Sequence, residues 1–196
     1  KGILLDTIDI PESKKHYGLS VIYPKLSTTE FPYASEWIRK VVDENREDFY
    51  ETVNEEVASN DTSESDLRYC RWMRPRLLYR TKQLMSLVLE EGGGYNAGSP
   101  WFGYRSLNFD LAKKREITIS DYFILRTKTD SSFLENIFQR CVNNEFNLQG
   151  NLINDIKFAF DSTSVYFLLD KYDPLGWGIF SVEKEYIRDH INPLYR

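Results

Sequence analysis

The clearest pattern along the chain is an apolar stripe between Pro32 and Ala58. Hydrophobic residues recur there at intervals of three and four, which is typical of a helix with one buried face. The stripe consists of Ala34, Trp37, Ile38, Val41, Val42, Phe49, Val53 and Val57. Charged side chains fill the positions between them, and turn-forming residues 59–65 follow. We therefore expect one long amphipathic helix that ends in an exposed loop.

A second apolar stripe predicts another helix from about Ser131 to Asn144. Asp130 or Ser131 provides the N-cap oxygen that a first helical turn prefers, and Glu135 lies near the positive end of the helix. The stripe consists of Phe133, Leu134, Ile137, Phe138, Cys141 and Val142. We expect this helix to bury that side against a sheet.

Alternating apolar and polar residues predict strands on both sides of the long helix. Residues 3–10 and 16–26 form the first two, and Pro24 marks an end or a sheet edge. Residues 67–81 and 84–89 are either one long bent strand or a hairpin, with Pro75 at the break. The three glycines at 92–94 follow as a loop or as a place of close backbone packing.

The remaining residues predict a series of short elements. A strand at 104–111 is followed by a turn at 112–114, a return strand at 116–119 and a one-turn helix at 120–123. A hairpin is expected over 156–160 and 165–169, a core strand over 178–182, and a short helix or strand over 184–192. The predicted order is strands, a helix, strands, a second helix and more strands. This order indicates an α+β protein, with two main helices packed on an antiparallel sheet.

Composition allows a packed core and narrows the range of partners. Of the 196 residues, 41% are hydrophobic, so no disulfide is needed to hold the core. The net charge of -5 disfavours nucleic acid and suits a basic protein partner. Arginines and a lysine between residues 68 and 82 fit the solvent face of a sheet opposite acidic helix residues. No apolar run reaches the length of a membrane span.

The first residue and the two cysteines leave alternatives open. Because the chain begins at Lys1 rather than Met, we expect that a preceding segment was removed, either a signal peptide or a truncated region. Cys70 and Cys141 permit one internal disulfide, which would stabilise the fold by ~4 kcal/mol. Two separately buried thiols fit the same positions equally well.

Several short motifs of the second half resemble a known bacterial envelope domain. They are Asn96-Ala97-Gly98, Asn108-Phe109-Asp110-Leu111 with Lys114, Ile117-Thr118-Ile119-Ser120-Asp121-Tyr122-Phe123, Val165-Tyr166-Phe167 and the segment 171–178. The order of these motifs resembles the C-terminal domain family of the anti-sigma factor RsiV, also present in the peptidoglycan deacetylase PdaC. Residues 91–196 would form that domain, and residues 1–90 resemble the smaller domain that often precedes it. Two family features are absent, a histidine at the end of the glycine-alanine loop and a glycine in the turn at 112–114.

The resemblance implies an exported protein of the periplasm, the outer cell surface or the secreted fraction. It also implies a binding or sensing module, because RsiV recognises lysozyme through this domain. An N-terminal lipid anchor would be the route to the membrane. The chemistry of PdaC resides in a separate catalytic domain, and the resemblance gives this chain none.

The residues themselves give little support to catalysis. The chain has no His-Glu-x-x-His, Cys-x-x-Cys or Gly-x-Ser-x-Gly motif, and its two histidines are far apart in sequence. Glu90 and Glu91 form a carboxylate pair, but neighbours on a strand point to opposite faces and cannot flank one glycosidic bond. No cofactor and no metal site is expected.

Aromatic residues near the glycines are the best binding candidates, because rigid rings offer contact area at low entropic cost. The candidate ligand-binding residues are Tyr95, Asn96, Trp101, Tyr104, Tyr172 and Trp177. The alternative is that these rings close one end of the core. Our leading hypothesis is a non-catalytic envelope protein that binds a lysozyme-like basic protein or a cell-wall glycan. An enzyme acting on cell-wall polysaccharide and a purely structural lipoprotein domain are the competing hypotheses.

Overall fold

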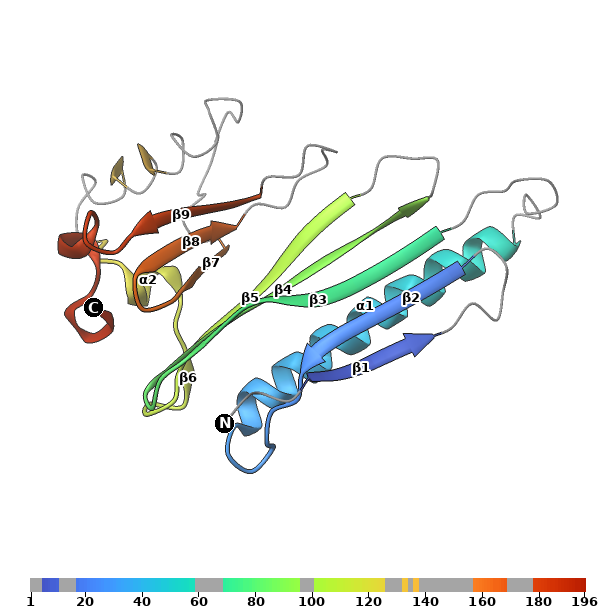
Figure 1. The fold of residues 1–196 in the computed structure, drawn as a ribbon, viewed down its shortest axis with the longest axis horizontal. Helices are drawn as coiled ribbons and strands as arrows, with labels where there is room; N and C mark the ends of the chain where they lie inside the picture. The colour runs from blue at the N-terminus through green and yellow to red at the C-terminus, as the bar shows by residue number, and fades with distance from the viewer. Residues whose placement is uncertain are drawn as a thin grey trace. The chain divides into compact units, whose positions relative to one another are not determined.

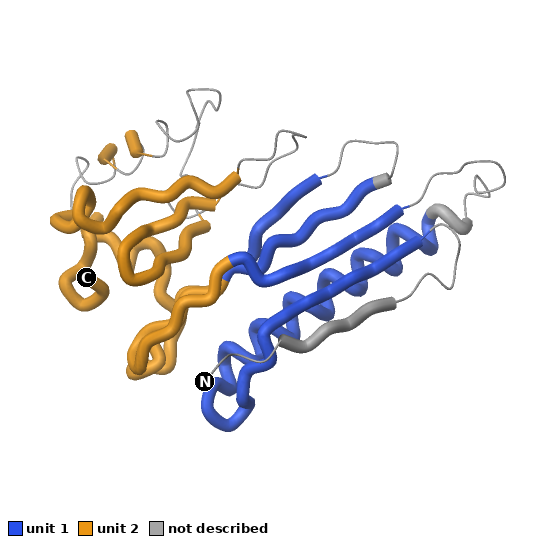
Figure 2. Tube along the Cα trace, in the orientation of Figure 1, with its two compact units in different colours: residues 1–76, 88–105, 170–176 blue, residues 77–87, 106–169, 177–196 orange. Residues whose placement is uncertain are grey.

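A computed structural model describes residues 5–10, 17–58, 69–95, 101–125, 132–133, 136–137, 157–168 and 178–196. The chain divides into two compact units, coloured separately in Figure 2. Unit 1 comprises residues 1–76, 88–105 and 170–176, and unit 2 comprises residues 77–87, 106–169 and 177–196. The family-based boundary at residue 90 stays a prediction.

Six strands form the larger sheet, in the same order as in the sequence. They are β1 (Leu5–Ile10), β2 (Tyr17–Pro24), β3 (Tyr69–Arg80), β4 (Leu84–Tyr95), β5 (Trp101–Asp110) and β6 (Arg115–Glu116). Most neighbours are antiparallel, as predicted, but β2 and β3 run parallel, with Tyr17 beside Tyr69 and Val21 beside Met73. Parallel neighbours need a long connection that crosses over, and the long helix between these two strands in the sequence provides it. The fold is therefore mixed α/β.

The helix α1 (Pro32–Ala58) confirms the predicted boundaries. Its stripe is buried as expected, with Trp37 half-buried and the buried members Ala34, Ile38, Val41, Val42, Phe49 and Val53. In unit 1 this stripe packs against β2, beside which α1 runs in Figure 1. Leu19 and Val21 of β2 supply the opposing apolar surface.

The strands β3 and β4 form a hairpin, which is one of the two arrangements that the sequence allowed for residues 67–89. Their turn is residues 81–83, where Thr81 N donates to Leu84 O at 2.8 Å. Pro75 lies inside β3 and does not break it, two residues beyond Met73, where the register with β2 ends. The glycines at 92–94 belong to strand β4, where Gly92 and Gly93 are buried.

The smaller sheet lies in unit 2 and consists of β7 (Lys157–Phe160), β8 (Ser164–Leu168) and β9 (Ile179–Glu183). These strands are antiparallel and confirm the predicted hairpin. The predicted one-turn helix is α2 (Ile119–Tyr122). Residues 188–190 and 193–195 are short 3-10 helices, whereas the sequence predicted a helix or strand over 184–192.

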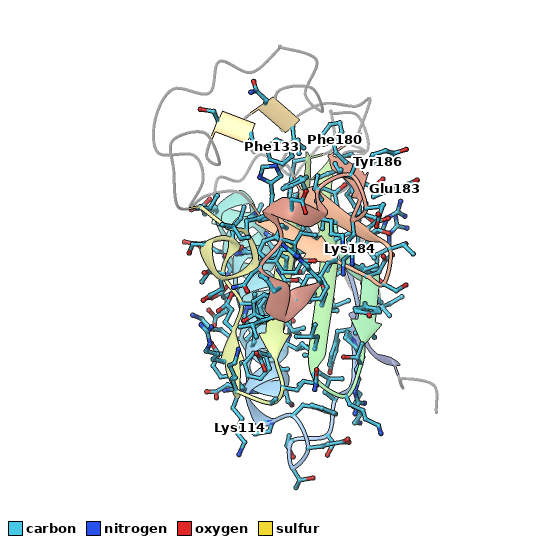
Figure 3. All side chains as sticks on the ribbon, turned by 90° about the vertical axis from the view of Figure 1, so that its left-hand side faces the viewer. Lys114, Phe133, Phe180, Glu183, Lys184 and Tyr186 are labelled. Carbon is cyan, nitrogen blue, oxygen red and sulfur yellow. The ribbon has the colours of Figure 1, made fainter. Side chains whose placement is uncertain are left out.

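The core of unit 2 is rich in aromatic rings. Tyr122 stacks between Phe160 and Tyr195 at centroid distances of 4.9 and 5.8 Å, and Phe123 stacks on Phe167 at 6.0 Å. Phe133 and Phe180, labelled in Figure 3, pack against this buried cluster. Unit 2 is therefore held together by a contiguous apolar core of its own.

The described part of the chain has one main helix where two were predicted. Of the second predicted helix, residues 131–144, only 132–133 and 136–137 are described, and these four are helical. Within the described ranges, none of the helices is both long and apolar enough for a bilayer.

Candidate functional site

Two tryptophans lie against the glycines of β4, one on each face of the sheet in unit 1. A Cβ atom on Gly92 would lie 2.6 Å from Cζ2 of Trp72, and one on Gly93 would lie 3.1 Å from Nε1 of Trp101. Contacts under 3.0 Å are essentially never made by real Cβ atoms. The absence of a side chain at Gly92 therefore lets the Trp72 indole lie directly on the strand.

On the sheet face opposite α1, Trp72 belongs to a group of four side chains that we call the Trp72 platform. Its members are Trp72, Arg74, Glu90 and Phe102. The guanidinium of Arg74 lies 4.8 Å above the Trp72 ring, and Phe102 packs beside that ring at 5.9 Å. Arg74 Nε also donates to Glu90 Oε2 at 2.9 Å. The carboxylate fixes the guanidinium, and the guanidinium and the strand together fix the indole.

The platform combines rigidity with exposure. The Glu90 side chain is 11% exposed and the Arg74 side chain 57% exposed, while Trp72 and Phe102 are half-buried. A ring held by a glycine strand below and a guanidinium above loses little conformational freedom when a partner binds. The platform therefore offers a fixed aromatic edge beside an accessible cation.

The face under α1 repeats this arrangement but is closed. Arg71 lies 5.0 Å from the Trp101 ring and donates from Nη2 to Asp48 of α1 at 2.9 Å. Only 7% of the Arg71 side chain is exposed. Arg71 therefore lies on the face of β3 that points toward α1, opposite to the face of Arg74, as strand alternation predicts.

Glu91 lies in a buried polar cluster beneath α1. Its oxygens accept from Asn45 Nδ2 at 3.0 Å and Arg105 Nε at 2.9 Å, and Arg105 also lies 3.9 Å from Glu44. Glu90 and Glu91 thus take different arginines on opposite faces, as the strand alternation predicted. Two carboxylates arranged in this way do not flank a common substrate bond.

The predicted binding residues fall into two groups. Trp101 is half-buried under α1, and Tyr104 is buried with 4% of its surface exposed. The buried Tyr104 gives a partner little to contact, whereas part of the Trp101 surface is exposed. The Tyr95 side chain and residues Asn96, Tyr172 and Trp177 lie outside the described residues.

Sequence reasoning missed Trp72, Arg74 and Phe102 as a group. The available signal was the spacing of Trp72 and Arg74, which places both on one face of a strand. The pairing of Trp72 with Gly92 links residues twenty positions apart and has no local signature. Cys70, on the same strand, is a free thiol, and Cys141 lies outside the described residues.

The Asn-Phe-Asp-Leu motif has a structural role within unit 2. Asn108 Oδ1 accepts from Ser86 Oγ at 2.7 Å, and Asn108 Nδ2 donates to Phe158 O at 2.7 Å. Ser86 Oγ in turn accepts from Phe160 N at 2.9 Å. Both Phe158 and Phe160 belong to β7, the outer strand of the smaller sheet. The two side chains therefore satisfy backbone groups at the edge of β7 that no described strand covers.

The motif that follows forms a capping box around α2. Thr118 Oγ1 accepts from Asp121 N at 3.2 Å, and Asp121 Oδ2 accepts from Thr118 N at 3.0 Å. Burial opposes ionisation of Asp121, but the Thr118 hydrogen bonds and Arg115 outweigh it and hold its pKa below the usual value. The next two residues, Tyr122 and Phe123, are the centre of the aromatic core. This motif fixes the fold and leaves little of itself for a ligand.

Lys114 lies in the turn after β5, with a φ of 54° in the left-handed region. Figure 3 shows its side chain at the tip of the turn, away from Lys184 and Tyr186. Over the described ranges, no group of three histidine, cysteine, aspartate or glutamate side chains could hold a metal ion.

Comparison with known proteins finds similarity at the level of the fold. A crystal structure of a DUF3298 family member from Bacteroides fragilis matches with a TM-score of 0.56 at 15% identity, over 97% of this chain and 94% of that one. A DUF3298 family protein from Pseudomonas aeruginosa matches with a TM-score of 0.60 at 10% identity, over 98% and 96%. No family model and no curated protein matches the chain. Nearly the whole chain therefore shares the fold of these DUF3298 structures.

Proposed function

We propose that this chain is a non-catalytic binding module of the cell envelope, exported from the cytoplasm and similar in role to RsiV-like domains. Its partner is a protein with a basic surface, for which lysozyme is the first probe. The observation that carries the proposal is the Trp72 platform, with its indole held against Gly92 and its guanidinium exposed.

The residue types of the platform support a protein partner. Tryptophan and arginine dominate binding hot spots, and a side chain that is already rigid loses less entropy on association. Arg74 is neutralised by Glu90 at 2.9 Å, so the platform presents a guanidinium plane without a strong local repulsion of a basic protein.

The distribution of charge adds a long-range attraction for such a partner. The chain has 30 acidic and 25 basic side chains. Within α1, Glu47, Asp48, Glu51 and Glu55 follow one another without an intervening basic residue, and all four are exposed. An acidic surface of this kind raises the association rate of a basic protein at low salt.

The enzyme alternative has weaker support. The carboxylates that could have served it, Glu90 and Glu91, are each bound by an arginine, Arg74 and Arg105. These two ion pairs hold the carboxylates on opposite faces of β4, where they do not flank a common substrate bond.

Titration of the purified chain with lysozyme tests the proposal, with a second basic protein of similar size as the control. We expect saturable binding at micromolar concentration or tighter that weakens as salt is raised. Co-sedimentation with purified peptidoglycan is the second arm. Binding to peptidoglycan with none to lysozyme would replace the protein partner by a glycan, and binding to neither would remove both.

A further inference from the structure

A pocket of about 340 Å³ lies in unit 1, between the first half of α1 and the chain that follows β2. Its floor is apolar, because Ile38 and Val42 line it and are 2% and 3% exposed. Leu26 closes one side. Volumes near 300 Å³ correspond to the lower end of small-molecule sites.

The rim of the pocket is cationic. Lys25, Arg39 and Arg46 line it together with one carboxylate, Asp43. Asp43 Oδ2 lies 3.4 Å from Arg39 Nη1, and Asp43 Oδ1 lies 3.9 Å from Arg46 Nη1. Arg39 and Arg46 share the single carboxylate of Asp43, which leaves an excess of positive charge, although the whole chain has a net charge of -5. An apolar cavity with such a rim attracts anions with an apolar part.

The Arg46 guanidinium is incompletely used by the protein. Its Nε is buried and has no hydrogen-bond partner in the part of the chain that the structure describes. A guanidinium has five N–H donors, and a buried donor without an acceptor costs ~1–3 kcal/mol. Arg46 also extends from the same side of α1 as Val42, because both line the pocket. Arg46 Nη1 lies 3.9 Å from Asp43 Oδ1, beyond hydrogen-bond distance, so a ligand carboxylate at the rim would meet a guanidinium that this carboxylate does not saturate.

We propose that this pocket binds a small amphipathic monoanion, a carboxylate with an unbranched apolar tail. The tail lies on Ile38, Val42 and Leu26, and the carboxylate accepts hydrogen bonds from Arg39 and Arg46. The site is separate from the Trp72 platform, since the pocket lies beside α1 and the platform lies on the opposite face of the sheet.

Isothermal titration of the full chain with decanoate tests the site, with decyltrimethylammonium as the matched cation and acetate as the matched anion without a tail. We expect one saturable site for decanoate and none for the other two. Arg46→Gln should weaken decanoate binding about ten-fold. Thr28→Trp, at an exposed position of the rim, should abolish binding by filling the pocket.

Lys40→Gln is the matched control, because Lys40 lies on the same helix, pairs with Glu44 at 3.7 Å and does not line the pocket. The affinity of the Lys40→Gln variant for decanoate should stay within about two-fold of the affinity of the unmodified chain. Equal binding of the cationic probe, decanoate binding that survives Thr28→Trp, or no saturable binding at all would each overturn the proposal.

Discussion

Trp72 and Gly92 are packed so closely that a methyl group on the glycine would lie 2.6 Å from the indole. This contact joins two strands of unit 1 and fixes the ring on which the proposed binding surface depends. The glycine triplet therefore acts by leaving room for an aromatic ring against the strand, and not through loop flexibility.

Gly92→Ala should displace the Trp72 indole and destabilise the fold by ~1–3 kcal/mol, because the added methyl has no room. The measurement is urea unfolding of a double-mutant cycle with Trp72→Ala. In the Trp72→Ala background the same glycine substitution should cost much less, since the clashing ring is gone. Equal costs in both backgrounds would mean that the indole does not explain the glycine.

Asn108→Ala should destabilise the chain by ~2–3 kcal/mol, because Phe158 O and the Ser86 hydroxyl would lose a buried partner. Asn54→Ala, at an exposed position of α1, should change the unfolding free energy by less than ~0.5 kcal/mol. Adding Ser86→Ala to Asn108→Ala should cost less than the sum of the two, since one network is lost only once. Additive costs would show that the two side chains act separately.

Two tyrosines of unit 2 should respond in opposite directions to loss of the hydroxyl. Burial raises the pKa of Tyr122, and its hydroxyl has no partner among the described residues. Tyr122→Phe should therefore raise the unfolding free energy by ~1 kcal/mol. Tyr166 donates to Asp161 at 2.6 Å, so Tyr166→Phe should lower it by ~1 kcal/mol. Thermal and urea unfolding of both variants measure the difference, and equal losses would contradict the account.

Lys114→Gly should stabilise the turn between β5 and β6. A non-glycine residue with a φ of 54° has a steric cost of ~1–2 kcal/mol that glycine avoids, although glycine loses more entropy on folding. We expect a net gain of ~0.5–1 kcal/mol in urea unfolding. Lys113→Gly is the control, because the structure gives Lys113 no positive φ and that variant should not be stabilised. A loss of stability in Lys114→Gly would contradict the turn geometry.

Local patterns predicted helices and strands well where the hydrophobic periodicity agrees with the turn-forming and capping residues. The three-and-four spacing in residues 32–58 gave α1 at its observed bounds, and residues 120–123 indicated the one-turn α2. Pro75 was predicted to mark a break, but β3 continues through it, beyond the end of the register with β2 at Met73.

Contacts between residues far apart in the sequence determine the features that local patterns did not predict. The parallel pairing of β2 with β3 depends on the path of α1 between them. The sequence left the glycines as a loop or a place of close backbone packing, because Trp72 is twenty residues away. Asn108 likewise takes Phe158 as its partner across fifty residues. The sequence did not bring Trp72 and Phe102 into the candidate site, because strand alternation was known but the face covered by α1 was not.

The most direct test of the account is the dissociation constant for lysozyme, measured on the unmodified chain, Trp72→Ala and Tyr33→Ala. Tyr33 is a matched control, an aromatic residue of unit 1 that is 45% exposed on α1. We expect micromolar or tighter binding that weakens at least about ten-fold in Trp72→Ala and stays within about two-fold in Tyr33→Ala. Undetectable binding by the unmodified chain, or equal affinities for all three proteins, would contradict the assignment of recognition to the Trp72 platform.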